Sequence, residues 1–240
     1  MGDDAALLDI VTSANVACGF HAGDPDIMVE TAAAARARGV AIGAHPGFPD
    51  LRGFGRNRIQ ESPRRIERDV AYQIGALQAC AALAGARLTH VKAHGALANL
   101  SNEDEAVAEA LARAVAGVDR GLALMVMPGL PAERAGARAG LPLVREIYAD
   151  RAYAEDGTLS PRSAPGAVIH DAQDAAERVA RMVGEGAVFT PGGRRIPAAI
   201  DTVCVHGDNP AALAMARAVR AGLERAGLAL RPYGEIRGTV

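Results

Sequence analysis

Short runs of small or β-branched apolar residues alternate along the chain with longer stretches rich in Ala and Arg at helical spacing. This alternation is typical of parallel strands joined by crossover helices, and it restricts the chain to the α/β class. The predicted strands cover residues 13–18, 40–44, 89–92, 122–127, 143–148 and 202–206. The predicted helices cover residues 26–38, 63–83, 103–116, 171–183 and 210–226.

Local signals fix some of these elements closely. Ser62 is a favourable N-cap, Pro63 suits the first helical position, and Gly85 follows the last turn of the helix predicted over 63–83. A long excursion covers residues 150–200, within which the segment 188–196 predicts a hairpin with a glycine turn. With 240 residues, half of them hydrophobic, and no linker or low-complexity segment, we expect a single domain over 1–240.

Charge and composition exclude several classes of function. A formal net charge of −2 gives no basic excess for binding nucleic acid or an anionic membrane surface. The start Met1-Gly2-Asp3-Asp4 is acidic and no apolar stretch could span a membrane, so we expect a cytoplasmic protein. Three widely spaced cysteines without a CxxC pair indicate buried, reduced thiols and no zinc site.

Polar side chains follow nearly every predicted strand at its C-terminal end. In parallel α/β folds the loops at these ends converge, so we expect these residues to meet. The fourth strand, which ends in Met127-Pro128-Gly129, is the exception. The residues at the other strand ends are His21 and Asp24, His45, Lys92 and His94, Glu146 with Asp150 and Arg151, and His206 with Asp208.

Not every histidine fits this pattern. His90 lies deeper in its strand and is expected to be a core histidine with satisfied hydrogen bonds, and His170 precedes a helix as a surface or capping residue. Strand alternation places His90, Lys92 and His94 on one face. A lysine there must be used chemically or be paired, and Glu146 or Asp208 could supply the partner.

Histidines and carboxylates near a lysine suit hydrolysis. A base would activate water, an acid would protonate a leaving nitrogen, and a cation would stabilise the oxyanion. Asp208 could orient His206, and Asp24 could orient His21. A divalent metal is also possible, but its identity and ligands remain open. The chain has no GxxxxGK[ST] motif for a nucleotide.

Several long strings resemble one known family. SANVACGFHAGDPDIM, GVAIGAHPGFPD, YQIGALQA, HVKAHGAL, REIYADRAYAEDGTLSPRS and TVCVHGDNP are similar to the LamB/YcsF family, whose members are A subunits of 5-oxoprolinases. The resemblance implies a seven-stranded (β/α) barrel related to glycoside hydrolase and deacetylase barrels. It also implies ATP-coupled cleavage of 5-oxo-L-proline to L-glutamate together with subunits B and C, with ATP bound mainly through those partners.

The resemblance also implies a set of site residues. Arg151 and Arg162 would bind the substrate carboxylate or a phosphate with Asp150 beside them, His45 or Asp24 would be the base for water, and Lys92 would lie at the oxyanion. The residues implied as catalytic are His21, Asp24, His45, Lys92, His94, Glu146, His206 and Asp208.

The sequence departs from the family pattern in three places. A first strand reading Asp-Leu-Asn-x-Asp-Leu-Gly-Glu is missing, so we expect a barrel that lacks this strand. Ala93 replaces a proline and Ala98 replaces a tyrosine. Two alternatives therefore stay open: a metal-dependent deacetylase-like hydrolase, and an inactive protein that only binds partners or ligand.

Overall fold

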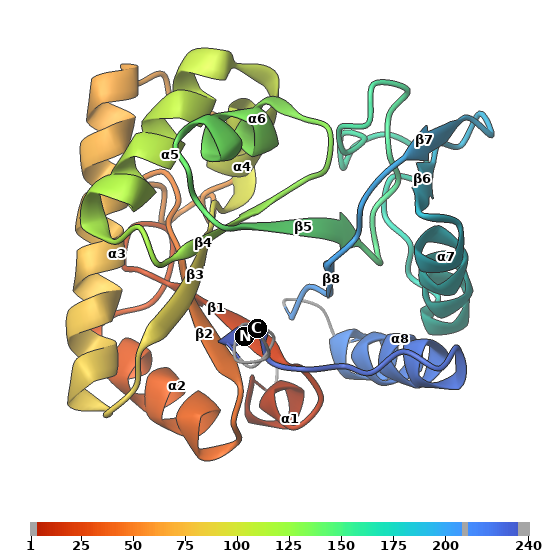
Figure 1. Ribbon diagram of the computed structural model, residues 1–240, viewed down its shortest axis with the longest axis horizontal. Coiled ribbons are helices and arrows are strands. Elements are labelled where there is room, and N and C mark those ends of the chain that lie inside the picture. Colours follow the sequence, from red (N-terminus) through yellow and green to blue (C-terminus); the bar gives the residue numbers. More distant parts are fainter. Residues whose placement is uncertain (1–3, 208–210, 235–240) are drawn as a thin grey trace. The chain divides into compact units, whose positions relative to one another are not determined.

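A computed structural model describes residues 4–207 and 211–234 of the chain (Figure 1). Helices and parallel strands alternate along nearly the whole chain, which confirms the predicted α/β class. The helices are α1 (Asp4–Leu8), α2 (Pro25–Ala37), α3 (Pro63–Leu83), α4 (Gly95–Glu103), α5 (Glu105–Val118), α6 (Pro131–Arg138), α7 (Ala172–Glu185) and α8 (Ala212–Arg225). The strands are β1 (Ser13–Ala17), β2 (Ala41–His45), β3 (Leu88–Lys92), β4 (Ala123–Val126), β5 (Leu143–Tyr148), β6 (Ala187–Phe189), β7 (Arg195–Pro197) and β8 (Thr202–Cys204).

The main sheet has the strand order β1-β2-β3-β4-β5-β8. Its pairs β1–β2, β2–β3, β3–β4 and β5–β8 are all parallel, as crossover helices require. Strands β6 and β7 pair antiparallel, and this confirms the hairpin predicted near residues 188–196.

The chain divides into two compact units. The first unit contains the described residues of 13–126, 130–144 and 232–240, and the second contains those of 1–12, 127–129 and 145–231.

In the first unit, helix α3 illustrates how the sequence determines an element. The Ser62 hydroxyl accepts a hydrogen bond from the Arg65 amide at 3.2 Å, and Pro63 opens the helix, as predicted. Its apolar residues recur at helical spacing and are buried at Ile66, Val70 and Ile74. This buried stripe packs α3 against α5 and the central strands.

In the second unit, α7 and α8 pack against each other through buried aliphatic and sulfur-containing side chains such as Val179 and Met215. The Arg220 guanidinium donates to the carbonyl of Ile10 at 2.6 Å. That contact joins α8 to the segment that follows α1.

Three helices were not predicted from sequence, α1, α4 and α6, because each is short and its apolar pattern merges with neighbouring loops. The helix predicted over 103–116 begins two residues later, since Asp104 is its N-cap and accepts from the amides of Ala106 and Val107. Strand β8 ends at Cys204, before the predicted end at residue 206. The predicted start of the last helix, residue 210, lies outside the described residues.

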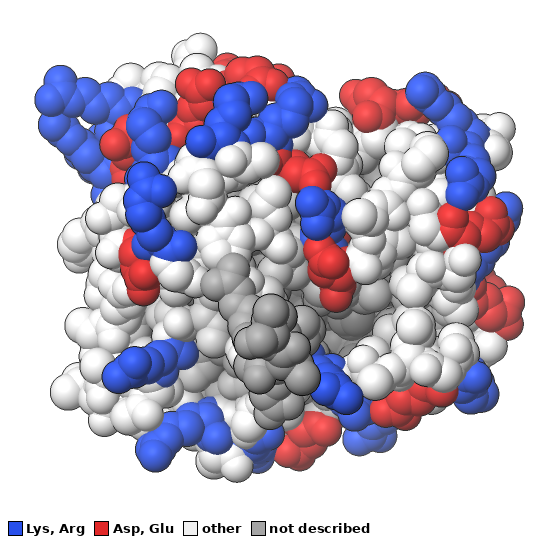
Figure 2. Space-filling view, in the orientation of Figure 1, with Lys and Arg blue, Asp and Glu red and all other residues white. Residues whose placement is uncertain are grey.

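All three cysteines are free thiols, with Cys18 and Cys204 buried as expected and Cys80 partly exposed. Among the described residues, no helix is long and apolar enough to cross a membrane. On the face shown in Figure 2, basic side chains lie beside acidic ones. The pairs Arg138–Glu105 and Arg138–Glu109, at 2.9 and 3.1 Å, are examples between α6 and α5.

Candidate functional site

Three histidines at neighbouring strand ends of the first unit lie in direct contact. His21 follows β1, His45 ends β2, and His94 follows β3. The rings of His21 and His94 stack with centroids 3.9 Å apart, and the ring of His45 meets that of His94 edge-on at 4.8 Å. We call these three residues the histidine cluster. It is the structural counterpart of the convergence predicted for the ends of these strands.

Hydrogen bonds fix the rings of His45 and His94. His45 Nδ1 lies 2.7 Å from the main-chain oxygen of Lys92, and His94 Nε2 lies 2.7 Å from that of Phe54. The remaining nitrogens, His45 Nε2 and His94 Nδ1, face each other at 3.1 Å. Both rings therefore have both nitrogens in close polar contact.

Phe54 supports this arrangement with an unusual backbone. Its φ of 53° lies in the left-handed region, which is rare for a bulky residue and strained. Its carbonyl oxygen contacts His94 Nε2. Its ring packs edge-on against His94 at 5.3 Å and against His21 at 5.7 Å. Strained backbone of this kind concentrates at functional sites.

Glycines make the close packing of the cluster possible. A Cβ on Gly47 would lie 2.7 Å from His21 Nδ1, and a Cβ on Gly55 would lie 2.7 Å from His94 Cδ2. Gly47, which follows His45-Pro46, thus permits close approach of its backbone to the ring of His21. Gly55 plays the same part but was not singled out from the sequence.

His21 is the most enclosed ring of the cluster, with 2% of its surface exposed. Its Nδ1 is buried and has no hydrogen-bond partner among the described residues. Burial, helped by the charge of His94, lowers the pKa of His21 to about 3. Burial also lowers the pKa of His45 well below its usual value, with His94 and Lys92 acting in the same direction. Both effects favour neutral imidazoles that can accept a proton.

Lys92 and His90 lie on β3 and are both buried. His90 is fully enclosed, with Nε2 3.1 Å from Asn15 Oδ1 and Nδ1 2.8 Å from Thr89 Oγ1, which confirms the core histidine that was predicted. A Cβ on Gly43 would lie 2.1 Å from His90 Nε2, so only glycine fits at that point of β2.

The structure places Asp24 away from the role of orienting His21. Its carboxylate accepts from the Ile27 amide at 2.9 Å and caps α2, and the residue is exposed. A capping carboxylate explains this aspartate by local helix chemistry alone.

In the second unit, a histidine and a carboxylate form a pair. His206 Nδ1 lies 2.8 Å from Asp150 Oδ2 and 2.9 Å from Oδ1. Burial raises the pKa of Asp150, but the hydrogen bond and charge of His206 outweigh it, so the net pKa is lowered. The sequence suggested Asp208 as the partner of His206. Asp208 lies outside the described residues, and the pairing with Asp150 was not foreseen.

Arginines surround Asp150 in different ways. Arg151 is buried, and its guanidinium donates to the carbonyls of Ser160 at 2.6 Å and Ala167 at 3.4 Å. Arg162 is exposed, and its charge contributes to lowering the pKa of Asp150. Arg178, which the sequence did not single out, donates to the carbonyl of Tyr148 at 3.0 Å.

Glu146 lies on β5 in the same unit and is buried, with 4% of its surface exposed. Its charge is close enough to contribute to raising the pKa of Tyr153, although burial is the main cause of that shift. The predicted site residues are thus distributed over both units: His21, His45 and His94 contact one another in the first unit, and His206 pairs with Asp150 in the second.

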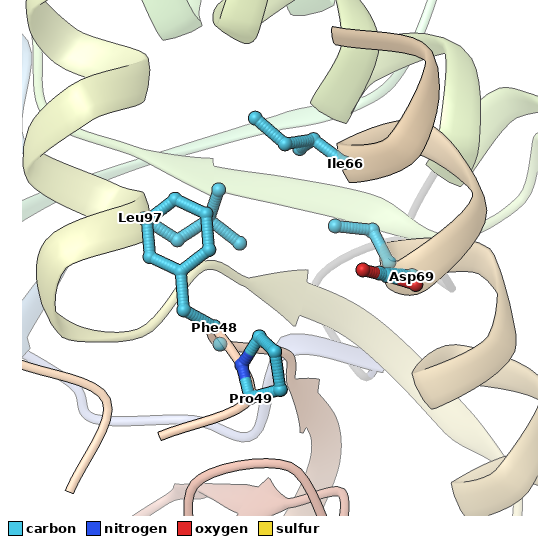
Figure 3. Close-up of a pocket in the computed structure, with 7 residues that line it drawn as sticks. Phe48, Pro49, Ile66, Asp69 and Leu97 are labelled. Carbon is cyan, nitrogen blue, oxygen red and sulfur yellow. The ribbon is translucent and has the colours of Figure 1, made fainter. Parts of the chain in front are cut away.

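A small hollow lies next to the loop after β2 (Figure 3). Phe48, Pro49, Ile66 and Leu97 line it with apolar surface, and Asp69 supplies the single carboxylate. That carboxylate already accepts from the Arg65 guanidinium at 2.9 Å. The hollow is much smaller than ordinary ligand sites, so we regard it as a packing feature. Among the described residues, no group of three or more His, Cys, Asp or Glu side chains could hold a metal ion.

Comparison with known proteins gives consistent results. The 5-oxoprolinase A subunit of Gluconobacter oxydans is 57% identical over 231 residues, which are 96% of this chain and 91% of that protein. The corresponding 5-oxoprolinase protein of Rhodopseudomonas palustris is 54% identical, over 97% of this chain and 92% of that protein. The crystal structure of a lactam utilization protein from Thermus thermophilus matches with a TM-score of 0.90 at 47% identity, over 97% of this chain and 93% of that one.

The fold agrees with the expectation of a (β/α) barrel type, since parallel strands and helices alternate as in that lactam utilization protein. The model of the LamB/YcsF family matches residues 1–238. The chain therefore belongs to the LamB/YcsF family.

Proposed function

We propose that this chain is the A subunit of a 5-oxoprolinase, which opens the ring of 5-oxo-L-proline to give L-glutamate in the cytoplasm. The observation that carries the proposal is identity above 50%, over almost the whole chain, to proteins named as the A subunits of 5-oxoprolinases. A five-membered lactam is a resonance-stabilised amide, so coupling to ATP would drive its opening. Subunits B and C would bind most of the ATP and activate the ring oxygen by phosphorylation, with release of ADP. Addition of water and ring opening would then give an acyl phosphate of glutamate, whose hydrolysis releases phosphate and L-glutamate.

In this proposal the first unit supplies the groups that act on water and on the developing charge. His45 is the base for water, because Asp24, the other candidate, already caps α2. The low pKa of His45, caused by burial and nearby charges, keeps its imidazole neutral before reaction. The buried Lys92 would stabilise the negative charge at the ring carbonyl oxygen, which the attached phosphate carries once ATP has activated the ring.

The second unit carries the arginines that we assign to an anionic group, a carboxylate or a phosphate. Arg162 is exposed and available to a carboxylate or phosphate, which a guanidinium binds with two parallel hydrogen bonds. Arg151 would act mainly by holding the loop, because it donates to the carbonyls of Ser160 and Ala167. His206 and the ionised Asp150 would form a second proton-transferring pair, with the buried Glu146 nearby in sequence.

The direct test measures glutamate formed from 5-oxoproline and ATP by the chain mixed with B and C subunits of one source. Loss of turnover in Lys92→Ala, with retention in the exposed control His170→Ala, would support the proposal. Equal activity of wild type and Lys92→Ala would contradict the assigned role of Lys92. No turnover with any preparation, together with release of acetate from acetylated sugars, would replace the proposal by a deacetylase.

A further inference from the structure

The hydrogen bonds of His45 and His94 leave a proton unaccounted for. A neutral imidazole carries one N–H, and a carbonyl oxygen can only accept a hydrogen bond. His45 Nδ1 lies 2.7 Å from the carbonyl of Lys92, so this nitrogen must be the donor. His94 Nε2 lies 2.7 Å from the carbonyl of Phe54, so the same reasoning makes it a donor.

If both imidazoles are neutral, each has a single N–H, and these two N–H groups donate to the carbonyl oxygens of Lys92 and Phe54. His45 Nε2 and His94 Nδ1 would then face each other at 3.1 Å with a lone pair on each and no proton between them. Such an arrangement is repulsive, yet 3.1 Å is a normal distance for a hydrogen bond that involves nitrogen. One additional proton would convert the repulsion into a hydrogen bond.

We infer that His45 and His94 bind one proton in common between Nε2 and Nδ1 and act as a single proton-accepting unit. The facing lone pairs increase the affinity for this first proton, as in other molecules that hold two basic nitrogens close together. Groups whose titrations are coupled in this way share macroscopic steps, and neither residue has a titration of its own.

The surroundings of the pair limit it to one proton. Among the residues that the structure describes, titratable groups beside the pair include His21, which stacks on His94, Lys92 on β3, and the Cys18 thiol, whose pKa burial raises to about 12. None of these three described groups supplies a negative charge. Burial and the positive charge of Lys92 oppose protonation of His45, and a second proton would add repulsion within the pair.

The backbone of Phe54 positions the ring of His94 within this pair. Its left-handed φ of 53° is part of the turn that presents its carbonyl to His94 Nε2. While the Phe54 carbonyl accepts a hydrogen bond from His94 Nε2–H, the tautomer of His94 with its proton on Nδ1 is disfavoured. The strain at Phe54 thus supports a tautomer in which the inner nitrogen can accept a proton.

This inference also deepens the proposed function. The catalytic step described next rests on that proposed function, whereas the shared proton does not. As the water oxygen bonds to the ring carbonyl carbon, the unprotonated pair would accept the proton that water loses, and this would be the one proton that the pair can hold. As the carbon–nitrogen bond breaks, the pair would return that proton to the ring nitrogen. Both rings are partly exposed, which such transfers require.

The test uses the 240-residue chain alone and so does not depend on lactam turnover. Nitrogen-15 NMR of histidine-labelled protein is recorded against pH for the wild type and for His94→Asn. In the wild type, the inner nitrogens of His45 and His94 should shift together with one midpoint. In His94→Asn, an amide can donate to His45 Nε2 without an additional proton, so the shift at His45 should be lost.

Separate midpoints for the two wild-type rings would overturn the inference, as would neutral rings over the whole range. A bound metal ion between the nitrogens would overturn it too. Elemental analysis would detect such a metal as one ion per chain in the wild type and none in His94→Asn. Because His94→Asn could affect folding, Thr89→Val serves as a control: it alters the partner of His90 and should leave the shared midpoint in place.

Discussion

The two units handle histidine in opposite ways. In the first unit, His21, His45 and His94 contact one another and main-chain carbonyls, and no carboxylate appears among the hydrogen bonds that the described residues make to their rings. In the second unit, His206 is held by the buried carboxylate of Asp150 at 2.8 Å. The first arrangement favours neutral, proton-accepting rings, whereas the second supports an imidazole with an ionised partner. The difference suggests separate chemical tasks for the two groups.

The largest expected difference between the histidines of the two units is their effect on catalytic activity. If the histidine cluster acts on water, His45→Gln should lower kcat/KM for glutamate formation by roughly 10²- to 10⁴-fold, the range for loss of a general base. The measurement uses the chain with B and C subunits. His170→Gln, an exposed histidine outside both groups, should match the wild type. A loss smaller than that of His206→Gln would reverse the assignment of tasks.

The next prediction concerns the glycines that pack the cluster. Gly55→Ala places a methyl group 2.7 Å from His94 Cδ2 at a residue with φ of 67°. Overpacking and backbone strain together should lower the free energy of unfolding by about 3 kcal/mol. The control Gly207→Ala, beside His206, meets only the flexible end of Leu7 at 2.9 Å. Denaturant unfolding should show little change for it, and equal losses would mean that the cluster is not specially dependent on glycine.

The carboxylate of the second unit has a smaller expected effect. Asp150→Asn leaves a neutral amide beside His206 and should destabilise the protein by about 2 kcal/mol at neutral pH. Because the folded-state pKa of Asp150 is lowered, its stabilisation exists above the ordinary carboxyl pKa and disappears as pH falls through the folded pKa. The difference from wild type should therefore shrink in acid. A difference independent of pH would indicate a packing effect.

The pH dependence of the free energy of unfolding tests the buried His90 of the first unit. Burial, together with the charge of Lys92, lowers the pKa of His90 from its ordinary value of 6.5 to about 3, so the folded state binds fewer protons than the unfolded state between these values. The stability from this histidine is complete above the ordinary pKa. It is lost at about 1.4 kcal/mol per pH unit as pH falls towards 3. His90→Gln should reduce the slope of unfolding free energy against pH by one proton, and an unchanged slope would contradict a neutral buried His90.

Much of the fold was predictable because its signals are local. The strands over 13–17 and 143–148 and the helix over 63–83 follow from apolar periodicity and from the cap at Ser62. Helix α4 was missed because His94 precedes it without a side-chain cap. The clustering of His21, His45 and His94 was also predictable, since parallel strands place their C-terminal ends side by side.

Other features depend on contacts between residues far apart in the sequence. No local signal links Asp150 to His206 across 56 positions. The left-handed backbone of Phe54 and the 3.1 Å contact of two imidazole nitrogens arise only when distant segments pack together.

The sequence by itself determined the α/β class, the family and the types of side chain at the strand ends, because periodicity, caps and motifs are properties of short segments. Only the tertiary structure decided which nitrogen faces which acceptor. A hydrogen bond depends on distances of a few tenths of an ångström and on direction, and these are set by the packing of whole elements.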